Sequence, residues 1–170
     1  MSGFFDFDDI DTFTTGAFGE PGHRTFFLQV RFAGAQVNLK CEKQQVAAIA
    51  QYVRRLLSDL PGPDDRPLPQ SLELAAPSDP DFIVGPIGLA YDQELDRFVL
   101  MLEEAVETDE EGEPLPESIE DQGRLRFRLT RGQALAFCDH ADEVVSAGRP
   151  TCIFCGQPMD PDGHPCPRMN

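Results

Sequence analysis

The residues best suited to chemistry lie near the C-terminus, in a stretch that reads C-I-F-C-G-Q-P-M-D-P-D-G-H-P-C. Cys152 and Cys155 form a C-x-x-C pair, and His164 and Cys166 form an H-x-C pair after a spacer of eight residues. Two close pairs of thiolate and imidazole ligands, joined by a short loop, are typical of a structural zinc site. We therefore predict a structural Zn²⁺ whose four tetrahedral positions are filled by Cys152, Cys155, His164 and Cys166.

Two other uses of these cysteines must be weighed against metal binding. Two of them could form a disulfide, or Cys152 and Cys155 could be a redox pair. A redox C-x-x-C usually lies near a βαβ pattern, whereas this one follows a predicted helix and is rich in Pro and Gly. Thiols also stay reduced in the cytoplasm, where clustered cysteines more often hold a metal. We favour zinc over both alternatives.

Composition and charge limit the classes of function. The 170 residues suffice for one domain with a buried core and a small appendage. No apolar run approaches the roughly 20 residues of a membrane helix, and the first residues lack a basic signal-peptide region, so we expect a cytoplasmic protein. The formal net charge is −16, which repels phosphate backbones and anionic membrane surfaces. We expect neither direct nucleic-acid binding nor membrane binding.

The first part of the chain predicts strands followed by a long helix. Residues 1–18 are rich in Phe and Asp, and we expect one N-terminal strand packed by its Phe residues. Apolar and polar residues alternate from Arg24 to Phe32 and from Ala35 to Cys41, as in two paired strands. From Glu42 to Leu60 the apolar residues recur at helical spacing instead.

The middle of the chain predicts a linker, a hairpin and a loop. Residues 61–80 contain six prolines and indicate an irregular crossing segment. Phe82–Tyr91 and Arg97–Val106 read as a β-hairpin. Ten acidic residues lie between Glu103 and Asp121 with few apolar anchors, so we expect a mobile acidic loop over 107–121.

The last regular elements are a strand and a helix. Gly123–Thr130 alternates apolar residues with a row of three arginines, Arg124, Arg126 and Arg128. Thr130-x-x-Gln133 is a capping box that opens a helix, and Gly148 ends it. The apolar stripe of this helix consists of Ala134, Phe137, Cys138, Ala141, Val144 and Val145.

Together these elements predict an α+β fold, with a largely antiparallel sheet, two helices packed on one of its faces and a small C-terminal zinc-binding knuckle. We expect an α+β domain over 1–149 and a zinc-binding tail over 150–170. A strand pair followed by a helix occurs at 19–60 and again at 85–148, which indicates a two-fold ββα pseudo-repeat.

The arginine row has two interpretations. A row of planar guanidinium groups, extended by Arg131, could bind a carboxylate or phosphate. Alternatively the arginines pair across strands with Glu103 and its acidic neighbours. We favour pairing in so acidic a chain. We identify no catalytic residue, because the three histidines are scattered singly, and His140 and Asp139 are adjacent in a helix and so do not face one another.

Three stretches carry a resemblance to a known family: G-E-P-G-H-R-T-F-F-L-Q-V, L-K-C-E-K-Q-Q-V and G-R-P-T-C-I-F-C-G-Q-P-M-D-P-D-G-H-P-C-P-R. In this order they resemble the bacterial domain-of-unknown-function 3090 family, from Phe4 to Met169. The resemblance implies no activity and no catalytic residue. It implies that the partner is one of the proteins encoded beside family members, which are a phosphatase-like protein and a kinase-like protein.

The leading hypothesis is therefore a noncatalytic, zinc-stabilised protein-interaction or adaptor protein. The first rival is an enzyme or ligand-binding protein that acts on a phosphorylated substrate through the arginine row. The second rival is a regulator that acts through the zinc tail, or an acidic mimic of nucleic acid.

Overall fold

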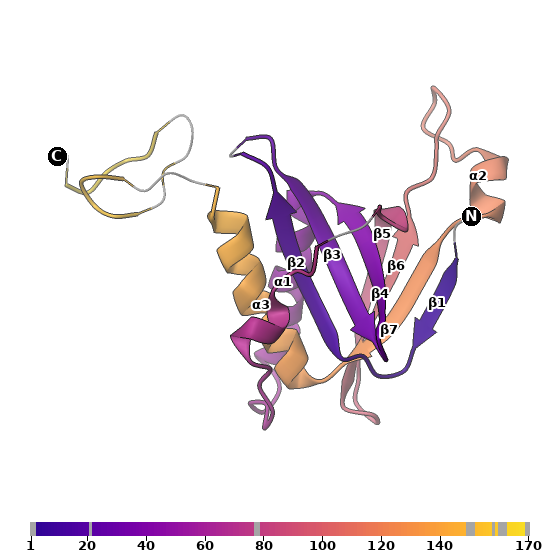
Figure 1. Cartoon of the computed structure of the whole chain (residues 1–170), viewed down its shortest axis with the longest axis horizontal. Helices are drawn as coiled ribbons and strands as arrows, with labels where there is room; N and C mark the ends of the chain where they lie inside the picture. Colours follow the sequence, from indigo (N-terminus) through magenta and orange to yellow (C-terminus); the bar gives the residue numbers. More distant parts are fainter. Residues whose placement is uncertain are drawn as a thin grey trace.

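The computed structural model describes residues 3–20, 22–76, 79–148, 152–157, 159 and 163–168. Within these residues the chain forms a mixed α/β fold with one seven-stranded sheet (Figure 1). The elements in chain order are β1 (Phe4–Phe7), β2 (Thr12–Phe18), β3 (Thr25–Phe32), β4 (Ala35–Cys41), α1 (Lys43–Leu57), the 3₁₀-helix η1 (Pro69–Leu72), β5 (Phe82–Asp92), β6 (Arg97–Glu104), α2 (Pro116–Glu120), β7 (Arg124–Leu129) and α3 (Arg131–Ser146).

The sheet is mostly antiparallel, as predicted, but it contains two parallel pairs. Its strand order is β1-β7-β6-β5-β4-β3-β2, and β1 runs parallel to β7 while β4 runs parallel to β5. Parallel neighbours need a long crossover connection, and α1 with the segment after it provides one between β4 and β5. This junction is short, because only Leu39 with Phe82 and Lys40 with Ile83 are paired.

The order of elements repeats along the chain. Three antiparallel strands and a helix, β2-β3-β4-α1, are followed by β5-β6-β7-α3. Each unit thus has one strand more than the ββα pattern that the sequence indicates. The junction of β4 with β5 joins the two units into a single sheet.

The prediction of one N-terminal strand over residues 1–18 was wrong, because two strands lie there. β1 pairs with β7 at one edge of the sheet, and β2 pairs with β3 at the other. The Phe residues are also not all packed, since Phe4 is 66% exposed and Phe18 is 46% exposed. The break between β1 and β2 coincides with three aspartates, Asp8, Asp9 and Asp11, which disfavour strand continuation.

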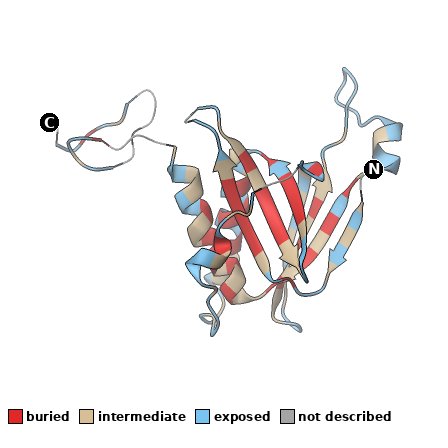
Figure 2. Ribbon diagram, in the orientation of Figure 1, coloured by how far each residue is buried: buried red, intermediate tan, exposed pale blue. Residues whose placement is uncertain are grey.

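One face of the sheet and both long helices share a single core (Figure 2). Phe13 of β2 lies at its centre, where its ring stacks on Phe137 of α3 at 4.1 Å and contacts Phe127 of β7 at 4.9 Å. Phe7 of β1 also stacks on Phe32 of β3, with ring centroids 4.8 Å apart. β1 and β3 are far apart in the strand order, so this contact shows that the sheet curls around its core.

The capping box predicted for the second long helix is confirmed. The Thr130 hydroxyl accepts a hydrogen bond from the Gln133 N–H at 3.0 Å, and the Gln133 side chain accepts one from the Thr130 N–H at 2.9 Å.

None of the helices in the described part of the chain is long and apolar enough to cross a membrane.

The proline-rich segment packs through polar contacts on the face of β2 and β3 that points away from the core. The buried Gln29 amide donates to the Ala75 carbonyl at 3.0 Å and accepts from the Ala75 N–H at 3.1 Å. Arg31 donates to the carbonyls of Ser71 and Glu73, both at 2.9 Å. Residues 77 and 78 of the predicted 61–80 linker lie outside the described residues.

The acidic segment 107–121 has local order but no buried residue. Thr108 forms a β-bridge with Pro114, and the Asp109 carboxylate accepts the N–H groups of Glu111 and Glu113 at 2.9 Å each. α2 follows as a helix of five residues. These are turn contacts that open at little cost, because no apolar side chain anchors them.

We expect a Glu-specific protease to cut first within 107–121 when the native protein is treated briefly. The reason is that cleavage requires local opening, and this segment opens without breaking the core. Peptide mapping by mass spectrometry locates the cut, and circular dichroism shows whether the nicked protein keeps its helices and sheet. First cuts within α1, or loss of the fold on nicking, would contradict the assignment.

Candidate metal centre

The segment that follows α3 extends from the end of this helix (Figure 1). It brings the four predicted ligands together. Their ligand atoms, three sulfurs and one ring nitrogen, all lie within 4.8 Å of one another. The Cys152 and Cys166 sulfurs are 3.9 Å apart, and the Cys155 sulfur is 3.3 Å from Nε2 of His164. Two sulfurs bound to one tetrahedral zinc lie about 3.8 Å apart, given Zn–S bonds near 2.3 Å. The cluster could therefore hold a metal ion.

A tight turn sets the first pair of cysteines. The Cys152 N–H donates to the Gln157 carbonyl at 2.8 Å, and the Gly156 N–H donates to the Cys152 carbonyl at 2.9 Å. Gly156 has a φ of 73°, a left-handed conformation that glycine adopts without strain. This turn brings both sulfurs to the same side of the chain. Residues 150–151, 158, 160–162 and 169–170 of the predicted 150–170 tail lie outside the described residues.

The histidine ring is oriented for binding through one nitrogen. Nε2 of His164 faces the Cys155 sulfur, while Nδ1 is buried and has no hydrogen-bond partner among the described residues. Since a ligating histidine binds through one nitrogen and keeps its proton on the other, Nε2 is the atom that would bind a metal ion, with the proton on Nδ1.

Hydrogen bonding differentiates the thiols of the first pair. The backbone N–H groups of Cys155 and Phe154 point to the Cys152 sulfur and hold the pKa of this thiol below its usual value. The N–H of Gln157 acts in the same direction on Cys155, but desolvation and the neighbouring Cys152 and Cys166 outweigh it and raise the pKa of Cys155. A metal binds thiolates, so the backbone N–H groups of this turn favour the metal-binding form of Cys152.

The end of α3, from which the cluster departs, is fixed to the sheet by Arg24. Its guanidinium donates to the carbonyls of Val144 at 2.9 Å and Val145 at 3.4 Å, and it lies 4.8 Å from the centre of the Phe26 ring. A Cβ at Gly148 would come within 2.7 Å of this guanidinium. A glycine at position 148 therefore lets the chain leave α3 close to Arg24, the residue that precedes β3.

Comparison with protein families gives one result. A family model described as "Protein of unknown function (DUF3090)" matches residues 5–166. The chain belongs to the DUF3090 family. The match ends at Cys166, so it includes all four residues of the metal cluster. Comparisons with curated proteins and with solved structures give no match.

The arginine row of the DUF3090 chain lies on the side of β7 away from the core, and its members contact carboxylates. The pairs are Arg124 with Glu103 at 3.6 Å, Arg126 with Asp6 at 2.9 Å, Arg128 with Asp8 at 3.0 Å and Arg131 with Asp96 at 2.9 Å. Sequence reasoning anticipated Glu103 as a partner. It missed the aspartates of the N-terminal segment, because the parallel pairing of β1 with β7 was not foreseen.

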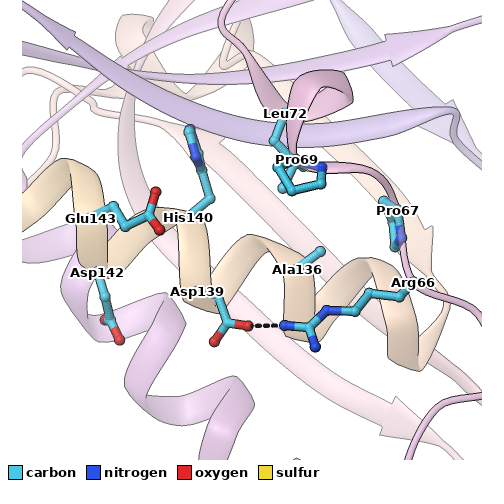
Figure 3. Close-up of a pocket in the computed structure, with 9 residues that line it drawn as sticks. All are labelled: Arg66, Pro67, Pro69, Leu72, Ala136, Asp139, His140, Asp142 and Glu143. Carbon is cyan, nitrogen blue, oxygen red and sulfur yellow. Dashed lines mark hydrogen bonds and ion pairs between the residues drawn. The ribbon is translucent and has the colours of Figure 1, made fainter.

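A polar hollow of about 430 Å³ lies beside α3 (Figure 3). Its lining includes Asp139 and His140, which point apart, as expected for adjacent helix residues. Asp139 accepts from Arg66 at 2.6 Å and from Arg54 at 3.0 Å. Nε2 of His140 instead lies 2.9 Å from the Thr15 carbonyl at the edge of the sheet. The hollow thus holds an ion-pair network and not a histidine–carboxylate pair.

The structure also exposes two apolar residues that sequence reasoning passed over. Ile153 and Phe154, between the first two cysteines, are 89% and 50% exposed. Their exposure could have been predicted from the C-x-x-C spacing. When both cysteines of such a turn point toward a shared metal ion, the two residues between them point toward solvent.

The two remaining cysteines are buried in the main core. Burial raises the pKa of Cys41 to about 12, with the nearby Glu42 carboxylate as a second cause. Burial also raises the pKa of Cys138 to about 12. Both thiols are therefore protonated and unreactive near neutral pH. This confirms the prediction that Cys41 is a core residue.

We expect a thiol reagent at pH 8 to modify three cysteines of the native protein after strong chelation, namely Cys152, Cys155 and Cys166. Cys41 and Cys138 should react only in denaturant, because their thiolates are scarce and covered. Mass spectrometry of the alkylated peptides distinguishes the two groups, and a Cys155→Ser variant should lose one fast-reacting thiol. Fast reaction of Cys41 or Cys138 in the native protein would show that the core is open.

Proposed function

We propose that this DUF3090 protein is a noncatalytic, zinc-stabilised protein-interaction protein. The Cys₃His cluster is the observation that carries the proposal. Soft thiolate and imidazole donors suit zinc and not magnesium or calcium. Four protein ligands would complete a tetrahedral shell and leave no position for the activated water of zinc hydrolases. The role of the metal would then be to shape the C-terminal segment.

The surroundings of the other candidate groups support contact and not turnover. In the described part of the chain, the arginine row already contacts carboxylates, so an anionic substrate would have to compete with Asp6, Asp8 and Glu103. His140 is engaged with the Thr15 carbonyl. These contacts weaken the rival hypothesis of an enzyme for phosphorylated substrates.

The net charge indicates the chemistry of the partner. A chain with a formal charge of −16 attracts a basic protein over long range and accelerates its association. The acidic segment 107–121, exposed along its whole length except for the half-buried Ser118, adds to this field. The phosphatase-like and kinase-like proteins implied by the family resemblance are the first partners to test.

We expect about one zinc per chain in protein purified without added metal. Replacing a ligand, as in Cys152→Ser, should remove the zinc, because apparent binding energies of roughly 10–16 kcal/mol depend on the complete ligand set. The matched control is Cys138→Ala, which removes a buried thiol outside the cluster and should keep the zinc. Elemental analysis measures both. Absence of zinc from the wild type, or its retention by Cys152→Ser, would refute the metal assignment.

We expect the affinity for a partner captured by pull-down and identified by mass spectrometry to fall about tenfold or more as salt rises from about 0.05 to 0.5 M, because screening shortens the range of attraction. Cys152→Ser should abolish binding, and Arg126→Gln should not. Binding that ignores both salt and Cys152→Ser would contradict the proposal. Turnover of a phosphorylated metabolite that Arg126→Gln abolishes would replace it with the enzyme hypothesis.

A further inference from the structure

The turn between the first two cysteines presents an apolar tip. Ile153 and Phe154 form this knuckle tip, and they are 89% and 50% exposed. The turn hydrogen bonds of Cys152 and Gly156 hold the backbone beneath them. Large apolar side chains displayed by a constrained turn can be buried by another surface with little loss of conformational entropy.

The same chain carries an apolar groove of about 320 Å³ between α1 and β5. Ala48, Ile49 and Tyr52 of α1 line one side, and Ile87 and Leu89 of β5 line the other. The groove exists because β4 pairs with β5 only near the start of β5, at Phe82 and Ile83. Beyond this junction, α1 replaces β4 as the neighbour of β5, and its Gln45 side chain donates to the Val84 and Gly85 carbonyls. Tyr52 is 49% exposed there.

The tip and the groove belong to segments whose sequences carry opposite charge. α1 contains no acidic residue, although the chain as a whole is strongly acidic. Its Arg54 is paired with Asp139 and Asp142 of α3, so Lys43 and Arg55 are the basic residues that α1 offers beside the groove. The stretch from Cys152 to Cys166 contains two aspartates and no Lys or Arg. Three thiolates and one divalent ion would add a further negative charge to it. The tip therefore belongs to an acidic segment, and the groove lies beside a basic helix.

We propose that the knuckle tip of one chain docks into the α1–β5 groove of a second copy of this chain. The exchange is reciprocal, so two tips and two grooves form a closed, two-fold symmetric dimer. The groove has room for the Phe154 ring, with Ile153 against Tyr52 at its mouth. This inference rests on the proposed function, because the tip is rigid only when the metal closes the turn.

The size and charge of the contact predict how it behaves. Two side chains per groove bury less than the roughly 1,200 Å² of a stable interface, so the dimer forms at high protein concentration and dissociates on dilution. Both copies carry a net charge of −16, and their mutual repulsion is screened by salt. Salt also screens the attraction between tip and groove, but two chains of −16 carry far more charge than these two segments do, so the loss of repulsion is the larger effect. Salt therefore strengthens this dimer, whereas it weakens binding to a basic partner.

Sedimentation velocity of the zinc-loaded protein, from about 10 μM to about 1 mM, tests the proposal at low and high salt. We expect the wild type to pass from monomer to dimer. Ile153→Ser with Phe154→Ser should remain monomeric, and so should Ala48→Glu, which places a charge in the groove at an exposed helix position. Ile83→Ser is the matched control, since Ile83 is as exposed as Phe154 but lies outside the groove.

A mixture of the tip variant with the groove variant gives a second, independent readout. One intact tip and one intact groove remain, so we expect a heterodimer weaker than the wild-type dimer. Crosslinking from a photoreactive residue at 154, in a mixture of isotope-labelled and unlabelled protein, should join two different chains at α1 or β5. Circular dichroism and zinc analysis on the same samples show that each variant is folded and loaded.

Three outcomes would overturn the proposal. They are a zinc-loaded wild type that stays monomeric throughout, a crosslink confined to a single chain, and a dimer that loses stability in the tip variant but not in Ala48→Glu. In each of them the metal-stabilised interaction protein of the proposed function still stands. Absence of zinc from the wild type would instead refute the proposed function first.

Discussion

The C-terminal segment is too short and too polar to bury a core of its own, and this is the constraint on which the rest of its structure depends. Among its described residues only Cys152 and Cys166 are buried, and their burial comes from the ligand cluster itself. Segments of this size need a metal or a disulfide to fold. Closure of the four ligands around one ion would therefore organise the whole segment, including the placement of Ile153 and Phe154 on its outside.

The main fold fixes the position at which this segment begins, which is the C-terminal end of α3. α3 is buried along one side by Phe13, Phe127 and the other residues of the core, and its last turn is fixed to β3 through Arg24. The segment thus begins from a helix end that cannot move far relative to the sheet. In the proposed interaction, this fixed origin would limit the directions from which a partner can approach the segment.

Local patterns in the sequence predicted much of this structure. Alternation of apolar and polar residues identified β3, β4 and β7 to within a few residues, the hairpin pattern identified β5 and β6, and the spacing of cysteines identified the four clustered ligands. What could not be predicted depends on pairing between distant segments. The parallel contacts of β1 with β7 and of β4 with β5 leave no periodic signal, and neither do the hydrogen bonds of Gln29 to Ala75. The apolar groove follows from the short β4–β5 junction, so it was equally hidden.

The pairing of β1 with β7 also has a consequence for synthesis on the ribosome. Asp6 and Arg126 face each other in this pair although 120 residues separate them in the chain. At roughly 5–20 residues per second, the N-terminal strand waits on the order of 6–24 s for its partner to be translated. During that time β1 has no strand to pair with, although Phe32 of β3, on which Phe7 stacks in the folded protein, is already synthesised. The first strand to emerge is thus among the last to be incorporated, and the sheet closes only when nearly the whole domain has left the exit tunnel.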